Sequence, residues 1–147
     1  MLGPAADPER QTPAEGDLRL LISEMNGRPT AVIYRAVAPG APRKQDFRSP
    51  VQNVSFDEVC MLNGAKAAVK RSDAGYTVEA AVPLADLGIA PAAGQTLRGD
   101  LGVLFSDGSG VQCVRRSYWS NRNTGVTADV PTEARLQPAE WGRFDFE

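Results

Sequence analysis

Turn-forming residues recur along the whole chain, and their spacing limits what the chain can fold into. Eleven prolines and fourteen glycines interrupt its 147 residues, so the segments between them are short and show almost no helical periodicity. The Asn26-Gly27 pair separates two runs of β-forming residues, and both residues accept the positive φ of a tight hairpin turn. Because no strand–helix–strand alternation appears, we predict an all-β fold rather than a parallel α/β sheet.

The second half of the chain repeats this pattern. Residues 65–84, AKAAVKRSDAGYTVEAAVPL, contain a predicted hairpin that turns at residues 73–75. Pro83 ends its second arm because proline has no N–H to donate to a sheet. Residues 83–89, PLADLGI, predict a single helical turn that ends at Gly88. A further hairpin through DGSG and a terminal strand, GRFDF, follow. We predict one antiparallel β-sandwich over residues 17–147, and a flexible lead-in over residues 1–16, which hold few large apolar groups.

Composition argues against several classes of partner and cofactor. The formal net charge is −2 with both signs scattered, which gives no electrostatic reason to expect nucleic acid or an anionic membrane as a partner. No apolar run approaches the roughly 20 residues of a membrane span, and the first sixteen residues do not resemble a signal peptide. The chain has no histidine, no CxxC pair and no phosphate-binding glycine loop. We therefore expect no zinc, haem or nucleotide, and a protein that is not an enzyme.

The two cysteines leave two alternatives open. Cys60 and Cys113 lie about 50 residues apart in the sequence. They either form one disulfide or act as two small buried hydrophobic residues, since both situations are common.

The segment RRSYWSNRNTG, residues 115–125, is too polar for a core strand and too aromatic for a loop that only connects two strands. An indole face beside guanidinium and amide donors suits a ligand made of ring C–H groups and hydroxyls, such as a sugar. The alternative is that Trp119 fills one end of the sandwich core. For Trp141 we expect packing against the edge of a sheet. The candidate ligand-binding residues are Trp119, Tyr118, Arg116, Asn121, Asn123 and Arg122.

The order of several elements resembles the middle of a family 9 carbohydrate-binding module. The matching positions in residues 75–110 are Glu79 and Pro83 on and after an alternating strand, Leu87 and Gly88 in the following turn, Gly94, and Asp100 on the next strand. The later YWS (residues 118–120) and EARLQPAEWGRFDF (residues 133–146) resemble the tail of such modules. The likeness covers about residues 17–147 and places the chain near the DOMON-like superfamily. It implies an immunoglobulin-like, jelly-roll-like antiparallel β-sandwich that binds sugars without catalysing a reaction, in an extracellular or periplasmic parent protein.

This chain departs from that family in two respects. The family begins with additional strands, whereas this sequence starts near the family's later strands. The family clamps a sugar between two tryptophans, and only Trp119 stands at such a position here. Because a sheet that lacks a strand has an unpaired edge, we expect a homodimer formed by strand pairing. The alternative function is a structural or interaction module without a sugar ligand.

The resemblance also implies calcium, which prefers six to eight oxygen ligands. Asp107, Asp129 and Glu133, with backbone carbonyls of glycine-rich turns, are the candidate ligands. Their spacing does not match an EF-hand loop, so this expectation depends on the resemblance alone. The alternative is that these carboxylates cap and form turns.

Overall fold

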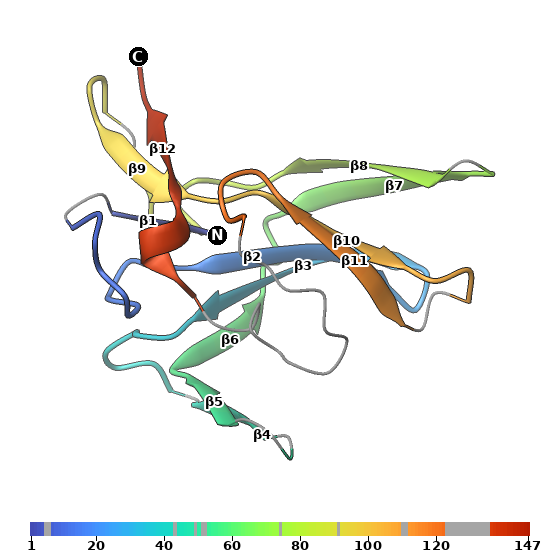
Figure 1. Cartoon of the computed structure of the whole chain (residues 1–147), viewed down its shortest axis with the longest axis horizontal. Helices are drawn as coiled ribbons and strands as arrows, with labels where there is room; N and C mark the ends of the chain where they lie inside the picture. The colour runs from blue at the N-terminus through green and yellow to red at the C-terminus, as the bar shows by residue number, and fades with distance from the viewer. Residues whose placement is uncertain are drawn as a thin grey trace.

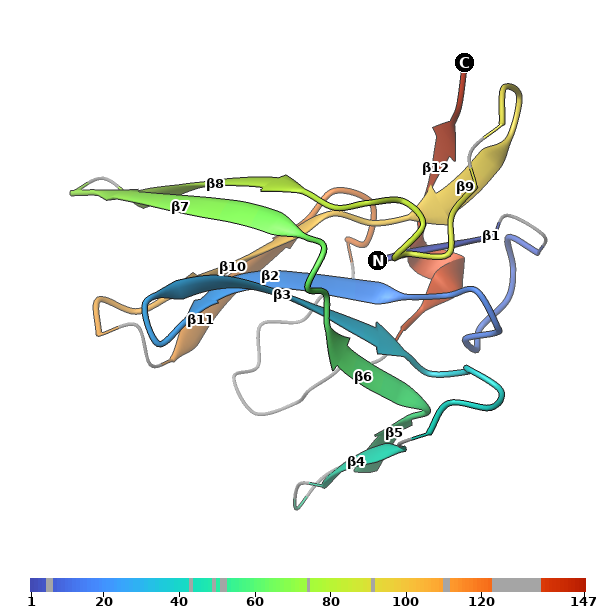
Figure 2. The ribbon, with the colours of Figure 1, turned by 180° about the vertical axis from the view of Figure 1, so that it is seen from behind.

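The computed structural model describes residues 1–4, 7–42, 44–48, 50, 53–73, 75–90, 92–109, 112–122 and 136–147. In these ranges the chain is all-β, which confirms the predicted fold class, and every strand pair is antiparallel. Figures 1 and 2 show hairpins β2–β3, β7–β8 and β10–β11 extending in the same general direction. None of the helices that the described ranges contain is long and apolar enough to cross a membrane.

Hydrogen bonding divides the described strands among small sheets of two or three strands. One three-stranded sheet contains β1 (Leu2–Pro4), β9 (Thr96–Gly99) and β12 (Gly142–Asp145). The other contains β2 (Arg19–Met25), β3 (Arg28–Arg35) and β6 (Glu58–Met61). The two-stranded sheets are β4 (Gln45–Arg48) with β5 (Asn53–Phe56), β7 (Lys66–Ser72) with β8 (Gly75–Ala81), and β10 (Gly102–Ser106) with β11 (Cys113–Tyr118). A 3₁₀ turn, η2 (Pro138–Glu140), precedes β12.

Local turn chemistry explains the first hairpin. Met25 pairs with Arg28, so two residues connect β2 to β3. Asn26 and Gly27 have φ values of 51° and 74°, and positive φ at both central residues matches the right-handed twist of the flanking strands. The predicted Asn-Gly hairpin is confirmed.

The predicted turn at residues 83–89 is also present. Successive amides of Asp86, Leu87 and Gly88 donate to carbonyls three residues earlier, at N···O distances of 3.0–3.1 Å. Gly88 ends the turn at a φ of 70°, a left-handed conformation that glycine adopts without steric cost. The turn buries Leu87 against Leu18 and Ile33.

Strands β9 and β10 are consecutive, with only Asp100 and Leu101 between them. Strand β12 pairs with β9, while β11 pairs with β10. The residues that follow β11 therefore meet the residues that begin β12, although more than twenty positions separate them in the sequence. This junction is visible in Figure 1, where β10 continues from β9.

The start of the chain differs from the flexible lead-in expected for residues 1–16. Residues 2–4 form β1 and pair with β9, and Leu2 exchanges backbone hydrogen bonds of 2.8 and 2.9 Å with Leu18. The fully buried Asp17 carboxylate accepts hydrogen bonds from both terminal nitrogens of Arg10 and from the Ala14 amide. These long-range contacts order a segment with few large apolar groups.

Buried apolar side chains form two clusters. Leu18, Ile33 and Leu87 make up one, and Phe56, Leu136 and Trp141 make up the other. Neither alternative for the cysteines holds, because Cys60 and Cys113 are both free thiols, one exposed and the other half-buried.

We expect Asp17→Asn to destabilise the fold by about 2–3 kcal/mol, because it removes the charge of a fully buried carboxylate that accepts hydrogen bonds from Arg10. Urea unfolding followed by circular dichroism measures this change. Asp73→Asn, at an exposed carboxylate in the β7–β8 turn, is the matched control and should change stability by less than about 0.5 kcal/mol. Equal effects of the two variants would contradict the role given to Asp17.

Hydrogen bonds from the Thr96 hydroxyl and then from Arg143 lower the pKa of Asp145 below its ordinary value of 3.8. The folded-state pKa lies below the unfolded one, so the small stabilisation from this carboxylate is present above pH 3.8 and is lost as the pH falls through the folded value. We expect Thr96→Val to raise the pKa of Asp145 in a carboxyl NMR titration. An unchanged titration curve would show that Thr96 does not set it.

Candidate functional site

The candidate site is centred on Trp119, which directly follows β11. Its backbone amide donates a 2.9 Å hydrogen bond to the Leu101 carbonyl, so the β10–β11 ladder extends by one residue. Its side chain is 49% exposed. The indole is therefore a surface group and does not fill the core, the alternative that the sequence left open.

The Trp119 indole packs against two residues of β12. The ring lies against Gly142, where a β-carbon would collide with it. It also packs on Phe144, with ring centroids 5.1 Å apart and planes inclined by 37°. Only glycine fits beneath the ring at position 142, so the sequence of β12 fixes how closely the indole approaches the sheet.

The loop after Trp119 is held by a buried carboxylate. Asp100 is 2% exposed, and its two carboxylate oxygens accept the backbone amides of Ser120 at 2.8 Å and Asn121 at 2.9 Å. Hydrogen bonds from amides to a carboxylate are stronger than those between neutral groups. Asp100 therefore fixes the direction in which the chain leaves the indole.

The two predicted residues within β11 lie on one side of the β10–β11 hairpin. Side chains alternate along a strand, so Arg116 and Tyr118 share a face, and both are half-buried. Tyr118 covers Gly102, its cross-strand partner. Arg115 lies on the other face and stacks over Phe105, with its guanidinium carbon 4.9 Å from the ring centroid. The sequence prediction missed this cation–π pair because it depends on strand register.

The remaining predicted ligand-binding residues follow Trp119 in the loop. Asn121 is half-buried and Arg122 is exposed. Asn123 lies outside the described residues. Asn121 and Arg122 are sequence neighbours of Trp119, and Asp100 fixes the backbone at the start of their segment. Strand alternation places Arg116 and Tyr118 on the face opposite to Trp119.

The predicted calcium ligands are only partly described. Asp107 closes the β10–β11 turn: its carboxylate accepts the Ser109 hydroxyl at 2.7 Å and the Gln112 amide at 3.3 Å. Asp129 and Glu133 lie outside the described residues. Within the described ranges, no group of three or more acidic, cysteine or histidine side chains is placed to hold a metal ion.

Trp141 has the packing role that the sequence predicted. It is 3% exposed and packs with Phe56 and Leu136. Its ring also lies 2.8 Å from where a β-carbon on Gly3 would stand. The indole joins β1 to the core, so the two tryptophans of the chain have different environments.

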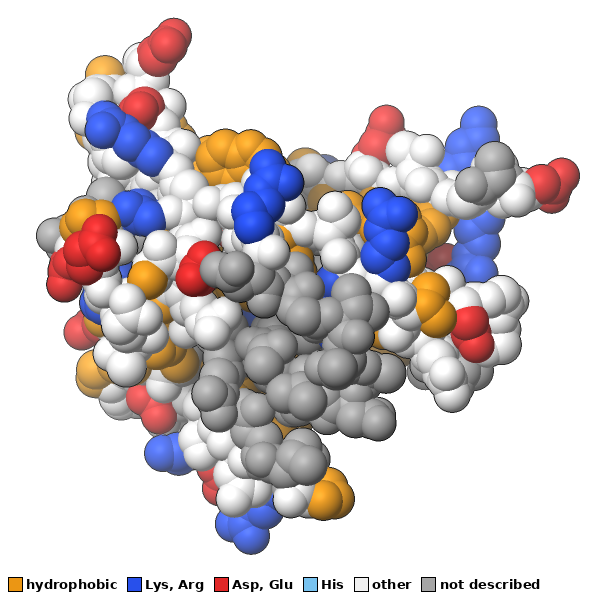
Figure 3. All heavy atoms as spheres, viewed as in Figure 1, with side chains coloured by type: hydrophobic (Ala, Val, Ile, Leu, Met, Phe, Trp, Pro, Cys, Tyr) orange, Lys and Arg blue, Asp and Glu red, His pale blue; other side chains and the backbone are white. Residues whose placement is uncertain are grey.

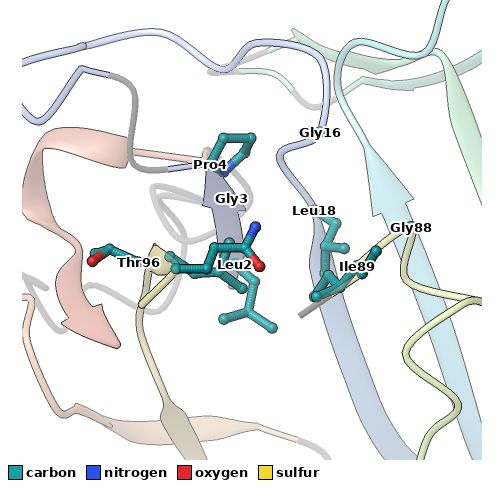
Figure 4. Close-up of a pocket in the computed structure, with 11 residues that line it drawn as sticks. Leu2, Gly3, Pro4, Gly16, Leu18, Gly88, Ile89 and Thr96 are labelled. Carbon is teal, nitrogen blue, oxygen red and sulfur yellow. The ribbon is translucent and has the colours of Figure 1, made fainter. Parts of the chain in front are cut away.

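A separate hollow of about 160 Å³ lies between β1, the start of β2, the turn at residues 84–88 and β9. Leu2, Leu18 and Ile89 supply much of its apolar wall (Figure 4). None of the predicted site residues lines it. Its volume is below the roughly 300 Å³ at which small-molecule sites begin, so we assign no ligand to it.

Comparison of the chain with protein-family models, curated proteins and solved structures finds no match.

We expect Asp100→Asn to loosen the segment after Trp119, because an amide has one acceptor oxygen for the two backbone amides that the carboxylate binds. Leaving one partly buried amide without its acceptor costs about 1–3 kcal/mol. Hydrogen exchange measured by NMR should accelerate at Ser120 and Asn121, with the amides of β2 and β3 as the internal reference. Unchanged exchange at both positions would show that Asp100 does not hold the loop.

Proposed function

We propose that the surface around Trp119 binds carbohydrate without catalysing a reaction. The observation that carries this proposal is an indole that is half exposed yet supported by Gly142 and Phe144 and followed by a loop held by Asp100. A pyranose ring presents an apolar C–H face that stacks on such a surface. An indole fixed in advance loses little conformational entropy when the ligand binds.

Polar residues that follow Trp119 in the sequence would supply the second requirement for sugar recognition, which is hydrogen bonding to hydroxyls. Arg122 is exposed within three residues of Trp119, and guanidinium N–H groups donate to sugar hydroxyls or, in pairs, to a carboxylate. Asn121 adds an amide that both donates and accepts. These donors fit a hydroxyl-rich or carboxylated sugar, and calcium and an extracellular or periplasmic parent protein remain part of the proposal.

The amount of open surface favours a second candidate, an interaction module. The accessible surface of the chain is 9766 Å², whereas a compact monomer of 15.7 kDa exposes roughly 7,300 Å². Large apolar side chains on β8, β10 and β11 account for part of the excess, among them Tyr76, Val103 and Val114. In Figure 3 hydrophobic atoms lie open beside basic side chains in the region of these hairpins. This candidate function needs no sugar.

A comparison of two variants tests carbohydrate binding. Trp119→Ala removes the stacking surface and should weaken binding to soluble oligosaccharides at least tenfold, measured by isothermal titration. Phe47→Ala is the matched control, because Phe47 is an aromatic residue of β4 with a nearly equal exposed fraction, 47% against 49%. We expect it to leave affinity unchanged.

The panel should contain neutral and uronic-acid oligosaccharides, with tryptophan fluorescence as a second readout. Absence of heat and of a fluorescence change at millimolar concentration across the panel would reject carbohydrate binding and favour the interaction module. Equal loss of affinity in the two variants would reject the assignment of the site to Trp119.

A further inference from the structure

Strand β10 has no strand partner on its outer edge in the described ranges, although the Tyr76 hydroxyl of β8 contacts one backbone carbonyl there. On its inner side β10 pairs with β11, and the hydrogen bond from the Trp119 amide to the Leu101 carbonyl shows which residues face that partner. Backbone groups alternate in direction along an antiparallel strand, so those of Gly102 and Leu104 point away from β11. No described strand pairs with this outer edge.

This edge lacks the features that protect exposed strands. Monomeric proteins guard such edges with charged side chains, prolines or bulges. The sequence of β10 is GVLFS, with no charge and no proline, and its bulge lies at the far end, between Phe105 and Ser106. Each of the other described strands of five or more residues contains at least one charged residue.

We propose that two copies of this chain join through β10, antiparallel and related by a twofold axis at Leu104. In this register Leu104 pairs with the Leu104 of the second copy, and Val103 lies opposite the second copy's Phe105. Aromatic and β-branched side chains directly opposite each other stabilise an antiparallel pair, and no like charges meet. The register is self-complementary, as a twofold interface requires.

The exposed apolar side chains of β10 are consistent with a second copy of this chain binding at the strand's outer edge. Val103 and Phe105 are 47% and 37% exposed and lie on the same face of β10, so the paired strands place them side by side. A stable interface of standard size buries roughly 800 Å² on each partner. At this edge Leu101, which is 65% exposed, adds apolar surface to that of Val103 and Phe105.

One contact must change when the second copy binds. The Tyr76 hydroxyl of β8 donates to the Leu104 carbonyl at 3.2 Å. In the dimer that carbonyl accepts the Leu104 amide of the other copy instead, and Tyr76 moves aside. Tyr76→Phe removes the competing donor and should therefore strengthen self-association.

Sedimentation and light scattering of the 147-residue chain test the proposal. We expect a dimer of twice 15.7 kDa, and we expect Val103→Lys to weaken its association at least tenfold, because a charge then lies against Phe105 of the other copy. Val114→Lys is the matched control, since Val114 on β11 is 49% exposed and lies outside the proposed pairing. It should dimerise like the wild type.

A double variant tests the register itself. Phe105→Glu alone should also weaken the dimer, whereas Val103→Lys combined with Phe105→Glu places opposite charges across both pairs and should restore association. The proposal is overturned if the wild type is a monomer at all accessible concentrations, since the edge then has another occupant. It is also overturned if Val114→Lys disrupts the dimer as strongly as Val103→Lys, or if the double variant is weaker than both single variants. Sugar binding is measured separately, so its failure does not affect this outcome.

Discussion

The buried carboxylate of Asp100 connects the parts of the molecule on which the proposed site depends. Its backbone exchanges hydrogen bonds with Met1, and its side chain binds two amides of the loop after Trp119. A buried charge persists only when hydrogen bonds replace its lost hydration, so the loop amides and the carboxylate stabilise each other. The indole that precedes this loop lies at the surface and packs on a glycine and a phenylalanine of β12.

The molecule combines this local rigidity with a small buried core. Two clusters of three buried residues each lie near β1, β3 and η2, while the hairpins β7–β8 and β10–β11 keep large apolar side chains exposed. A two-stranded sheet with one apolar face is marginally stable in water by itself. This constraint gives a physical reason for further strands to pair with such a hairpin, and it motivates the proposed β10 pairing.

Predictions that depend on local chemistry agree with the structure. The Asn26-Gly27 turn, the turn that ends at Gly88 and the last strand follow from backbone conformations that a few neighbouring residues determine. The expectation for residues 1–16 failed because the contacts that order this segment join positions far apart, such as Leu2 with Leu18 and β1 with β9. The amino-acid composition of a segment gives its apolar content, but it does not indicate which backbone N–H and C=O groups form hydrogen bonds.

The sequence by itself determined that the chain forms short antiparallel strands, and it identified Trp119 among polar neighbours as a candidate for ligand contact. Only the tertiary structure decided that this indole is exposed while Trp141 is buried, because burial depends on what the other strands place over each ring. It also decided that Gly142 lies beneath Trp119 and that Arg115 stacks on Phe105. These contacts follow from the pairing of β11 with β10 and of β12 with β9, and register is set by the whole sheet rather than by any one segment.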